Sequence, residues 1–272
     1  MKFCRRCCLN KALLGAHILV TRPEHQAGNL SRLIEEQGGI AVRFPAMEIV
    51  AREDSASIIA VLENLGEYQW VIFISANAVN FALKANSGKI GYKISPLKKG
   101  GQGGFVAIGQ ATKQAMEMAG LPVDLVPDNG YNSEALLAMP ELQRVAGQKI
   151  LILRGTGGRE ELATTLRSRG AVVNYLDVYK RIIPRIDNLP VVKLLTQHRL
   201  DVITVTSAEA LQNLRMLLGE ENNGLLFLIP LVVISNRIKG IAADMGFNRI
   251  VVTESPTDTA ILETVITCVT GE

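Results

Sequence analysis

The segments His17-Ile-Leu-Val-Thr-Arg22 and Lys149-Ile-Leu-Ile-Leu-Arg154 resemble each other and lie 154 − 22 = 132 residues apart. Each is a short apolar run that is followed by a turn, an amphipathic stretch and a glycine, at Gly38 in the first case and at Gly170 in the second. Self-similarity at a fixed offset is the sequence signature of a repeated structural unit. The question is then whether the rest of the chain repeats in the same order.

Three further pairs of segments keep that order. The first of them again has an offset of 203 − 71 = 132, and the next has 235 − 109 = 126, because a loop at residues 98–104 is longer in the first half. The pairs are Val71–Val79 with Ile203–Leu211, Phe105–Gly109 with Val232–Ser235, and Ser133–Leu137 with Asp258–Leu262. Ordered matches with one local gap predict an internal duplication.

Within each repeat, short Val/Ile runs alternate with segments of helical spacing. Ile18–Val20, Val71–Ile74, Val106–Ile108 and Ile150–Leu153 are apolar throughout, as buried parallel strands are. Several of the helical segments end at a glycine suited to a helix C-terminus, at Gly38, Gly120, Gly170 and Gly246. Such alternation predicts an α/β protein with two doubly wound parallel-sheet domains.

Two extended segments, Arg43–Val50 and Asp177–Pro184, interrupt the alternation at equivalent places in the two repeats. Each contains a proline and lacks helical periodicity, so its simplest use is to carry the chain from one domain to the other. If both segments cross, the first βα unit of each repeat joins the sheet of the other repeat. Periodicity alone leaves this exchange and two contiguous domains both open.

Composition narrows the functional class. A chain of 272 residues fits two ordinary domains, and its 48% hydrophobic and 20% charged residues are typical of globular proteins. A net charge of +3 and 5% aromatic residues argue against a nucleic-acid partner. The sequence contains neither an apolar run long enough for a membrane span nor a signal-type leader. We therefore expect a cytoplasmic protein.

The cysteines and histidines predict no metal centre. Cys4, Cys7 and Cys8 cluster in a tail at residues 1–15, but no second Cys/His pair completes a set of four ligands. Cys268 is expected to be a core residue. The tail is accordingly predicted to be dispensable for fold and activity.

Small, hydroxylated and glycine residues follow most of the predicted strands. In open α/β sheets this edge binds ligands, and backbone N–H groups at helix N-termini there suit anions. The alternative is plain helix capping by Ser, Thr and Asn, which is the better interpretation of any single loop. Their recurrence in both repeats favours an anion site. The segments are Thr21–Pro23, Ser75–Asn77, Gly109–Thr112, Arg154–Gly158, Thr206–Ala208 and Ser235–Arg237.

The ordered set of motifs resembles the uroporphyrinogen-III synthase family over residues 16–270. The resemblance is carried by Val20–Pro23, Phe73–Val79, Ala107–Gly109, Ile152–Gly155, Val178-Tyr179 and Thr206–Glu209. It implies two α/β domains joined by a two-stranded β-ladder, with the exchange described above. The implied divisions are residues 16–43 plus 183–272 for one domain, 48–178 for the other, and 44–47 with 179–182 for the ladder.

The resemblance also implies a reaction. The family cyclises hydroxymethylbilane, a linear tetrapyrrole, to uroporphyrinogen III, with loss of water and inversion of ring D through a spiro intermediate. Members use no cofactor, are usually monomers, and bind substrate in a cleft between the domains. A transient contact with the preceding pathway enzyme is compatible with this role, whereas nucleic acid and membranes are not expected as partners.

Carried over by position, Tyr179 is the catalytic candidate, because a tyrosine there assists water loss. Thr112 corresponds to a threonine that lines the cleft. Ser235-Asn-Arg237-Ile238 stands where some relatives have a Gly-x-Thr-Thr pattern, so Arg237 is expected to serve the substrate carboxylates instead of a hydroxyl. For Arg22 and Arg154 a ligand or inter-loop contact is weighed against a surface ion pair. The substrate-binding candidates are Thr21, Arg22, Ser75, Ala76, Asn77, Gly109, Thr112, Arg154, Gly155, Thr206, Ser207, Ser235 and Arg237.

Two rival classes remain at this point. One is a non-enzymatic two-domain binder of an anionic small molecule, for which the lack of a strong catalytic motif is natural. The other is a nucleotide-dependent Rossmann enzyme, which the absence of G-x-G-x-x-G after any strand disfavours. An assay that resolves the two isomers of the product separates all three, because spontaneous closure gives the uninverted macrocycle.

Overall fold

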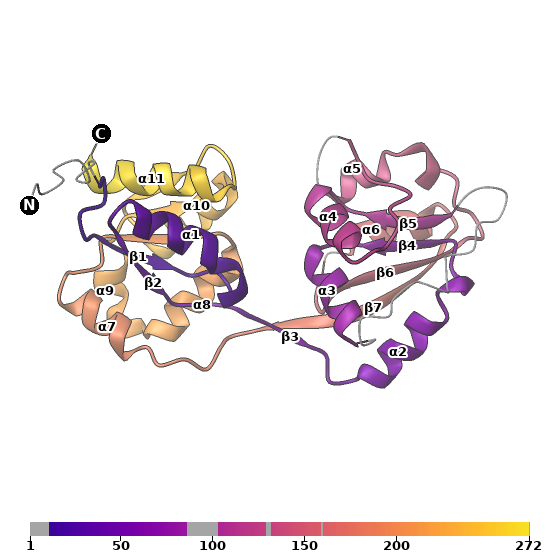
Figure 1. The fold of residues 1–272 in the computed structure, drawn as a ribbon, viewed down its shortest axis with the longest axis horizontal. Coiled ribbons are helices and arrows are strands. Elements are labelled where there is room, and N and C mark those ends of the chain that lie inside the picture. Colours follow the sequence, from indigo (N-terminus) through magenta and orange to yellow (C-terminus); the bar gives the residue numbers. More distant parts are fainter. Residues whose placement is uncertain (1–10, 86–102, 129–131, 159, 272) are drawn as a thin grey trace, which may run out of the picture. The chain divides into compact units, whose positions relative to one another are not determined.

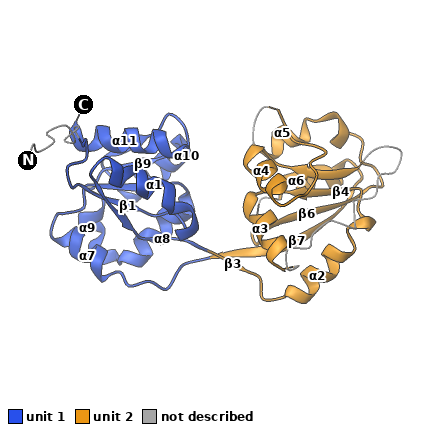
Figure 2. Cartoon of the chain, in the orientation of Figure 1, with its two compact units in different colours: residues 1–48, 182–272 blue, residues 49–181 orange. Residues whose placement is uncertain are grey.

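The computed structural model describes residues 11–85, 103–128, 132–158 and 160–271. The cysteine cluster of the tail and residues 98–102 of the longer loop lie outside the described residues. The chain forms two compact units, residues 1–48 with 182–272 (unit 1) and residues 49–181 (unit 2) (Figure 2). The first unit is thus built from both ends of the chain.

Unit 1 contains a parallel sheet with the strand order β10-β9-β8-β1-β2 (Figure 1). Its strands are β1 (His17–Val20), β2 (Ile40–Arg43), β8 (Val202–Val205), β9 (Leu231–Val233) and β10 (Ile250–Val252). Its helices are α1 (Glu24–Glu36), α7 (Leu189–Thr196), α8 (Ala208–Leu218), α9 (Asn223–Leu226), α10 (Asn236–Met245) and α11 (Asp258–Thr270), with a 3₁₀ turn at Glu220–Asn222.

Unit 2 contains a sheet with the order β3-β7-β6-β4-β5, in which β7, β6, β4 and β5 are parallel to their neighbours. Its strands are β3 (Glu48–Ala51), β4 (Trp70–Phe73), β5 (Gly104–Ala107), β6 (Lys149–Gly155) and β7 (Val172–Ile182). Its helices are α2 (Ser55–Glu63), α3 (Ala76–Ala85), α4 (Gln110–Met118), α5 (Ser133–Leu137) and α6 (Glu161–Ser168), with 3₁₀ turns at Leu65–Glu67 and Pro140–Leu142.

The two sheets have one topology once the repeats are aligned. In repeat order, β1, β2, β8, β9 and β10 correspond to β6, β7, β4, β5 and the isolated bridge that Leu125 forms with Val106, so both sheets run 2-1-3-4-5. β3 is an additional strand beside β7, and the chain passes between the units within these two strands, at residues 48/49 and 181/182. The predicted fold class, two doubly wound domains from a duplication with a two-stranded ladder, is confirmed.

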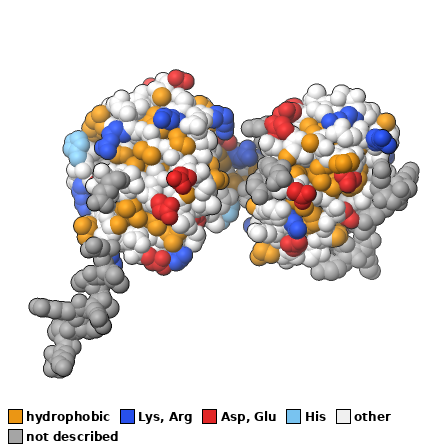
Figure 3. All heavy atoms as spheres, turned by 90° about the horizontal axis from the view of Figure 1, so that it is seen from above, with side chains coloured by type: hydrophobic (Ala, Val, Ile, Leu, Met, Phe, Trp, Pro, Cys, Tyr) orange, Lys and Arg blue, Asp and Glu red, His pale blue; other side chains and the backbone are white. Residues whose placement is uncertain are grey.

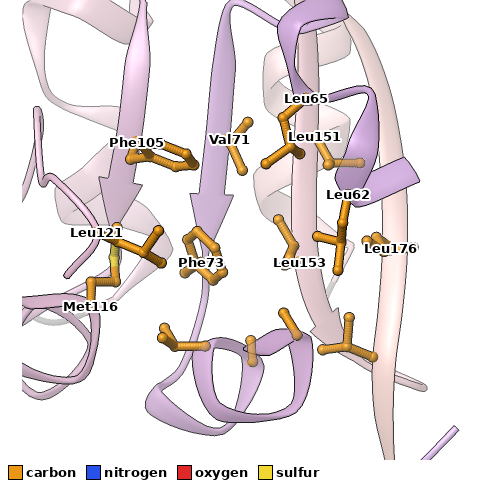
Figure 4. Close-up of a cluster of buried hydrophobic side chains, with 14 of the residues drawn as sticks. Leu62, Leu65, Val71, Phe73, Phe105, Met116, Leu121, Leu151, Leu153 and Leu176 are labelled. Carbon is orange, nitrogen blue, oxygen red and sulfur yellow. The ribbon is translucent and has the colours of Figure 1, made fainter. Parts of the chain in front are cut away.

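Alternating strand residues form a core on each face of both sheets. In β1, Ile18 and Val20 pack with α1 and α11, whereas Leu19 packs with α7, α8 and α10 on the other face. In unit 2, Phe73 and Phe105 face each other with ring centroids 6.2 Å apart, in the cluster that α2, α3 and α4 cover (Figure 4). Burial on both faces explains why the strands are apolar without alternation.

The surface carries charges of both signs. On the face that Figure 3 shows, acidic, basic and apolar side chains are interspersed over each unit. Among the helices of the described residues, none has both the length and the hydropathy that crossing a bilayer requires.

Candidate functional site

Each unit has one topological switch point, where the strand order reverses between its first and third repeat strands. In unit 1 this point lies between β1 and β8, and in unit 2 it lies between β6 and β4. Doubly wound sheets bind ligands in the crevice outside the carboxyl ends of these strands, and the 2-1-3-4-5 order follows the same rule. The predicted segments Thr21–Pro23 and Thr206–Ala208 end the strands at the first point, and Arg154–Gly158 and Ser75–Asn77 at the second.

A tyrosine and a serine meet at the switch point of unit 2. The hydroxyl oxygens of Tyr179 and Ser75 are 3.2 Å apart, and Ser75 Oγ also accepts the backbone N–H of Ala78 at 3.0 Å, at the start of α3. Tyr179 is only 2% exposed, whereas Ser75 is half-buried. Most of the solvent-exposed surface of this pair therefore belongs to the serine. Ala76 and Asn77 are also half-buried, in the first turn of α3.

The position of the Tyr179 ring depends on Gly155. The pairing of β6 with β7 shifts by one residue after Arg154, so that Gly155 pairs with Tyr179. A Cβ atom on Gly155 would lie 2.3 Å from Cε2 of the tyrosine ring, a distance that real contacts do not show. On its other sides the ring lies 5.6 Å from that of Phe81, centroid to centroid, and 5.9 Å from the Arg181 guanidinium carbon. Glycine at 155 is therefore required for this packing.

Arg154 is tied to its own unit by two carboxylates. Its Nε donates to Asp177 at 3.0 Å, its Nη1 donates to Glu160 at 2.8 Å, and its guanidinium carbon lies 3.5 Å from the ring centroid of Tyr175. Burial lowers the pKa of Arg154, but the hydrogen bonds to Glu160 and Asp177 outweigh burial and leave it raised. Arg154 is thus ion-paired within its own unit, and a ligand or inter-loop role of its side chain stays a prediction.

The same cluster perturbs two neighbours. Tyr175 donates its hydroxyl to Glu160 at 2.6 Å. This hydrogen bond, followed by the one from Arg154, lowers the pKa of Glu160, while burial raises the pKa of Tyr175. Glu160 therefore stays ionised beside the Gly155–Gly158 loop.

Thr112 lies in the first turn of α4, which begins after Gly109 at the carboxyl end of β5. It is 3% exposed, and its hydroxyl makes no hydrogen bond to any described residue. The Thr112 hydroxyl oxygen is not one of the described buried atoms that lack a partner, so it is open to solvent, and a ligand at this edge can reach it. The equivalent residue of unit 1, at 112 + 126 = 238, is the buried Ile238.

The switch point of unit 1 is occupied by internal contacts. Arg22 forms an ion pair with Asp258, the first residue of α11, and Asn29 donates to the other carboxylate oxygen at 2.6 Å. Thr21 is fully buried and donates its hydroxyl to the carbonyl of Thr204 at 2.8 Å. The Thr21 side chain is therefore held inside the unit, because β1 is a central strand, and the contact of Thr21 with substrate stays a prediction.

The other predicted residues of unit 1 begin helices. Ser207 Oγ accepts the N–H of Ala210 at 3.0 Å, and Ser235 Oγ accepts the N–H of Ile238 at 3.4 Å, so both are helix caps. Thr206 is half-buried, and Arg237 is exposed in the first turn of α10 with no ion pair to a described residue. Arg237 is therefore a cation of this edge that is available to an anionic ligand.

A shallow depression beside the ladder strands was not foreseen from the sequence. Arg52, Glu53, Asp54 and Lys180 line about 180 Å³ of open space, and Lys180 Nζ lies 2.8 Å from Glu53 Oε1. Arg52 Nη1 also donates to the hydroxyl of Thr156 at 3.4 Å. The adjacency of Lys180 to Tyr179 was the available signal. As for metals, no group of three His, Cys, Asp or Glu side chains within the described ranges is arranged to hold one.

Comparisons with known proteins agree on one family. The model of the family described as uroporphyrinogen-III synthase HemD matches residues 28–263. The chain is 31% identical over 246 residues to the uroporphyrinogen-III synthase of Escherichia coli K12, a match that covers 90% of this chain and 98% of the relative. It is 32% identical over 248 residues to the enzyme of Salmonella typhimurium, with the same coverage.

Two solved structures share the fold. A mutant uroporphyrinogen III synthase from the extremely thermophilic bacterium Thermus thermophilus superposes with a TM-score of 0.62 at 14% identity, over 95% of this chain and 100% of that one. The uroporphyrinogen-III synthetase of Helicobacter pylori gives a TM-score of 0.56 at 13% identity, over 93% of this chain and 99% of that one. At such identities the likeness is one of fold.

Proposed function

The chain belongs to the uroporphyrinogen-III synthase family, and we propose that it cyclises hydroxymethylbilane to uroporphyrinogen III, losing water and inverting ring D through a spiro intermediate. It is on this basis a cyclising lyase of porphyrin biosynthesis. The observation that supports the site most directly is the contact between Tyr179 and Ser75 at the switch point of unit 2.

The chemistry asks for few protein groups. The reaction starts with departure of a hydroxyl from an electron-rich pyrrole, which needs a proton donor and surroundings that tolerate a delocalised cation. After that, holding the chain so that the inverted ring closes is a matter of positioning. A site with one hydroxyl pair and several anion-binding loops meets these needs, and no resident cofactor is required by the proposal.

In unit 2 we assign the proton donor to the Tyr179–Ser75 pair. Thr112 is assigned a hydrogen bond to substrate, since its hydroxyl has no partner among the described residues. The free N–H groups in the first turns of α3 and α4, after Ser75 and Gly109, suit the many carboxylates of the linear tetrapyrrole. Arg154 and Gly155 support this edge, by holding its loop and by leaving room for the tyrosine.

In unit 1 we assign carboxylate binding to the first turns of α8 and α10. Ser207 and Ser235 orient these turns, and the exposed guanidinium of Arg237 supplies a positive charge next to the second of them. Arg22 acts through Asp258 and supports the start of α11. The hydroxyl of Thr21 holds the end of β1 to β8.

The test is an assay that separates uroporphyrinogen III from the uninverted isomer. Freshly made hydroxymethylbilane, incubated with the protein, should yield the inverted isomer at a rate proportional to protein concentration. A pure binder of the anionic chain, the alternative function, would yield only the uninverted product of spontaneous closure. That outcome would overturn the proposal.

The proposal extends to the setting of the enzyme. Because free hydroxymethylbilane closes spontaneously to the wrong isomer, we propose a monomer that works in the cytoplasm and takes its substrate by transient contact with the enzyme that makes it. Light scattering coupled to gel filtration should give the mass of one 29.5 kDa chain. A stable dimer would contradict this part of the proposal alone.

A further inference from the structure

We propose that the hydroxyl of Ser75, rather than that of Tyr179, contacts the leaving hydroxyl of the substrate, and that Tyr179 supplies the proton through Ser75. This inference rests on the proposed cyclisation. It makes Ser75 the catalytic residue of the pair and Tyr179 a positioning and proton-supplying residue behind it.

Burial separates the two hydroxyls. Tyr179 is 2% exposed, with its ring against Gly155 and Phe81, and among the described residues its hydroxyl has Ser75 as its hydrogen-bond partner. Ser75 is half-buried at the end of β4, where ligands of doubly wound sheets bind. A ligand at this edge therefore reaches the serine before the tyrosine.

Counting donors and acceptors shows that the pair can pass a proton outward through Ser75. A serine hydroxyl has two lone pairs and one hydrogen. The N–H of Ala78 occupies one lone pair of Ser75, and Tyr179 occupies the second if its hydroxyl donates. The hydrogen of Ser75 is then left for a partner outside the unit. We assign this arrangement as the resting state.

The proton step balances without a further reactant. Ser75 gives its proton to the hydroxyl of the hydroxymethyl group, whose C–O bond breaks with its electron pair, so that water leaves and a cationic azafulvene remains. Ser75 takes the proton of Tyr179, and the phenolate that forms has the Arg181 guanidinium 5.9 Å from its ring centroid. The cation then attacks the substituted α-carbon of ring D and forms the spiro intermediate, which has no proton to lose at that carbon. The older C–C bond of the same carbon breaks, the cation re-forms on the neighbouring ring, and it attacks the free α-carbon of ring D. This last carbon loses its proton, which returns along the same path.

A difference between the two repeats supports the assignment: both have the serine cap, but one of them has the tyrosine. Ser207 caps α8 of unit 1 through the N–H of Ala210, as Ser75 caps α3 through that of Ala78. The position equivalent to Tyr179 is 179 − 132 = 47, which is Met47, and it has no proton to give. The hydroxyl pair is therefore an addition to the shared cap rather than a consequence of it.

Three substitutions test the relay. Ser75→Gly keeps a residue that caps helices well but removes the hydroxyl, so we expect kcat to fall about 10- to 100-fold with a small change in the unfolding midpoint. Tyr179→Phe should give a loss of similar size. The double variant should be no slower than the slower single variant, because groups that act as one unit are not additive. Ser75→Thr, which restores a hydroxyl, should recover most of the rate.

A matched variant and a proton count complete the test. Asn132→Ala is the matched control. It removes the hydrogen bond of 2.9 Å in which Asn132 Oδ1 accepts the N–H of Ala135 and caps α5 of the same unit, and it should leave kcat unchanged. A plot of kcat against the fraction of D₂O in the solvent should be curved for the intact protein, because two protons move in the step. The same plot should be a straight line for Tyr179→Phe, in which one proton moves.

Full activity of Ser75→Gly, or losses that multiply in the double variant, would overturn the relay. Full activity of Tyr179→Phe, or no recovery in Ser75→Thr, would do the same. If the intact protein produces no inverted isomer, the proposed cyclisation fails instead.

Discussion

The switch points of the two units start from the same residue and end with different chemistry. Arg22 and Arg154 lie 132 residues apart at the ends of β1 and β6, and each is paired with acids of its own unit. One residue further along the chain, unit 1 has Pro23, the N-cap residue that precedes α1, whereas unit 2 has Gly155, which makes room for Tyr179. The duplication thus kept the scaffold in both units, while the hydroxyl pair arose in one.

The arginines offer the largest contrast in stability. Arg154 has a 10% exposed side chain and two carboxylate partners, one of which, Glu160, is 58% exposed, whereas Arg22 has Asp258 alone. Removing Arg154 leaves two carboxylates without their cation, and because both acids are partly open to water, Arg154→Ala should cost about 2 kcal/mol, less than the loss of a fully buried pair. Arg22→Ala should cost about half of that.

Urea unfolding measures this difference. The single tryptophan, Trp70 in β4, reports on unit 2 by fluorescence, and far-ultraviolet circular dichroism reports on both units. Arg154→Lys is the matched control, because it keeps the charge but lacks the fork that reaches two acids. A larger loss of unfolding free energy in Arg22→Ala than in Arg154→Ala would contradict this expectation. It would show that the number of carboxylate partners does not decide how much each arginine stabilises the protein.

The next contrast is between Gly155 and Pro23. Gly155→Ala places a Cβ atom 2.3 Å from the Tyr179 ring, so either the ring or the end of β6 has to move. We expect about 1–3 kcal/mol of destabilisation and at least a roughly 10-fold lower kcat. Pro23→Ala, at the repeat-equivalent position, should change stability by less than about 1 kcal/mol. Normal activity in Gly155→Ala would mean that the ring position is unimportant for turnover.

The scaffold was readable from the sequence because it depends on local patterns. The run Ile18–Val20 lies within β1, and the predicted terminal glycines Gly38, Gly120, Gly170 and Gly246 all have positive φ, between 69° and 108°. The order of the motifs alone predicted the duplication.

The contacts of the site were not readable, because they join distant elements. Glu160 meets Arg154 only when α6 begins beside the end of β6, and the shift that pairs Gly155 with Tyr179 leaves no local signature. The burial of the Thr21 side chain was not readable for a related reason. A threonine after a strand resembles an exposed cap, but here the strand has neighbours on both sides and its end is buried.

Thr112 of unit 2 and its equivalent in unit 1, Ile238, differ by a hydroxyl group. Thr112→Val gives unit 2 a β-branched apolar side chain, as Ile238 does in unit 1. No hydrogen bond to a described residue is lost, so the unfolding midpoint should stay the same or rise. If the hydroxyl binds the substrate, KM should increase about 10-fold, the equivalent of one hydrogen bond to a charged group. An unchanged KM would remove Thr112 from the binding site.

The smallest expected effect is a dependence of stability on pH that unit 2 owes to Glu160. The hydrogen bond from Tyr175, and then the one from Arg154, hold the pKa of this carboxyl below its ordinary value in the folded protein. A group whose pKa is lowered by folding stabilises the protein above its unfolded pKa, which is about 4.3 for glutamate, and this stabilisation is lost as the pH falls through the folded pKa. The urea midpoint of unfolding, followed by tryptophan fluorescence, should therefore decrease when the pH is lowered below about 4.3, and it should decrease less in Glu160→Gln.

Glu53→Gln is the matched control for this prediction. Glu53 also has a lowered pKa, but it pairs with Lys180 on the open surface, where its side chain is 89% exposed. A surface pair contributes little, so its removal should change the acid limb less than the removal of Glu160 does. Equal slopes for both variants and the intact protein would show that the arginine and tyrosine contacts of Glu160 do not distinguish it from a surface carboxylate.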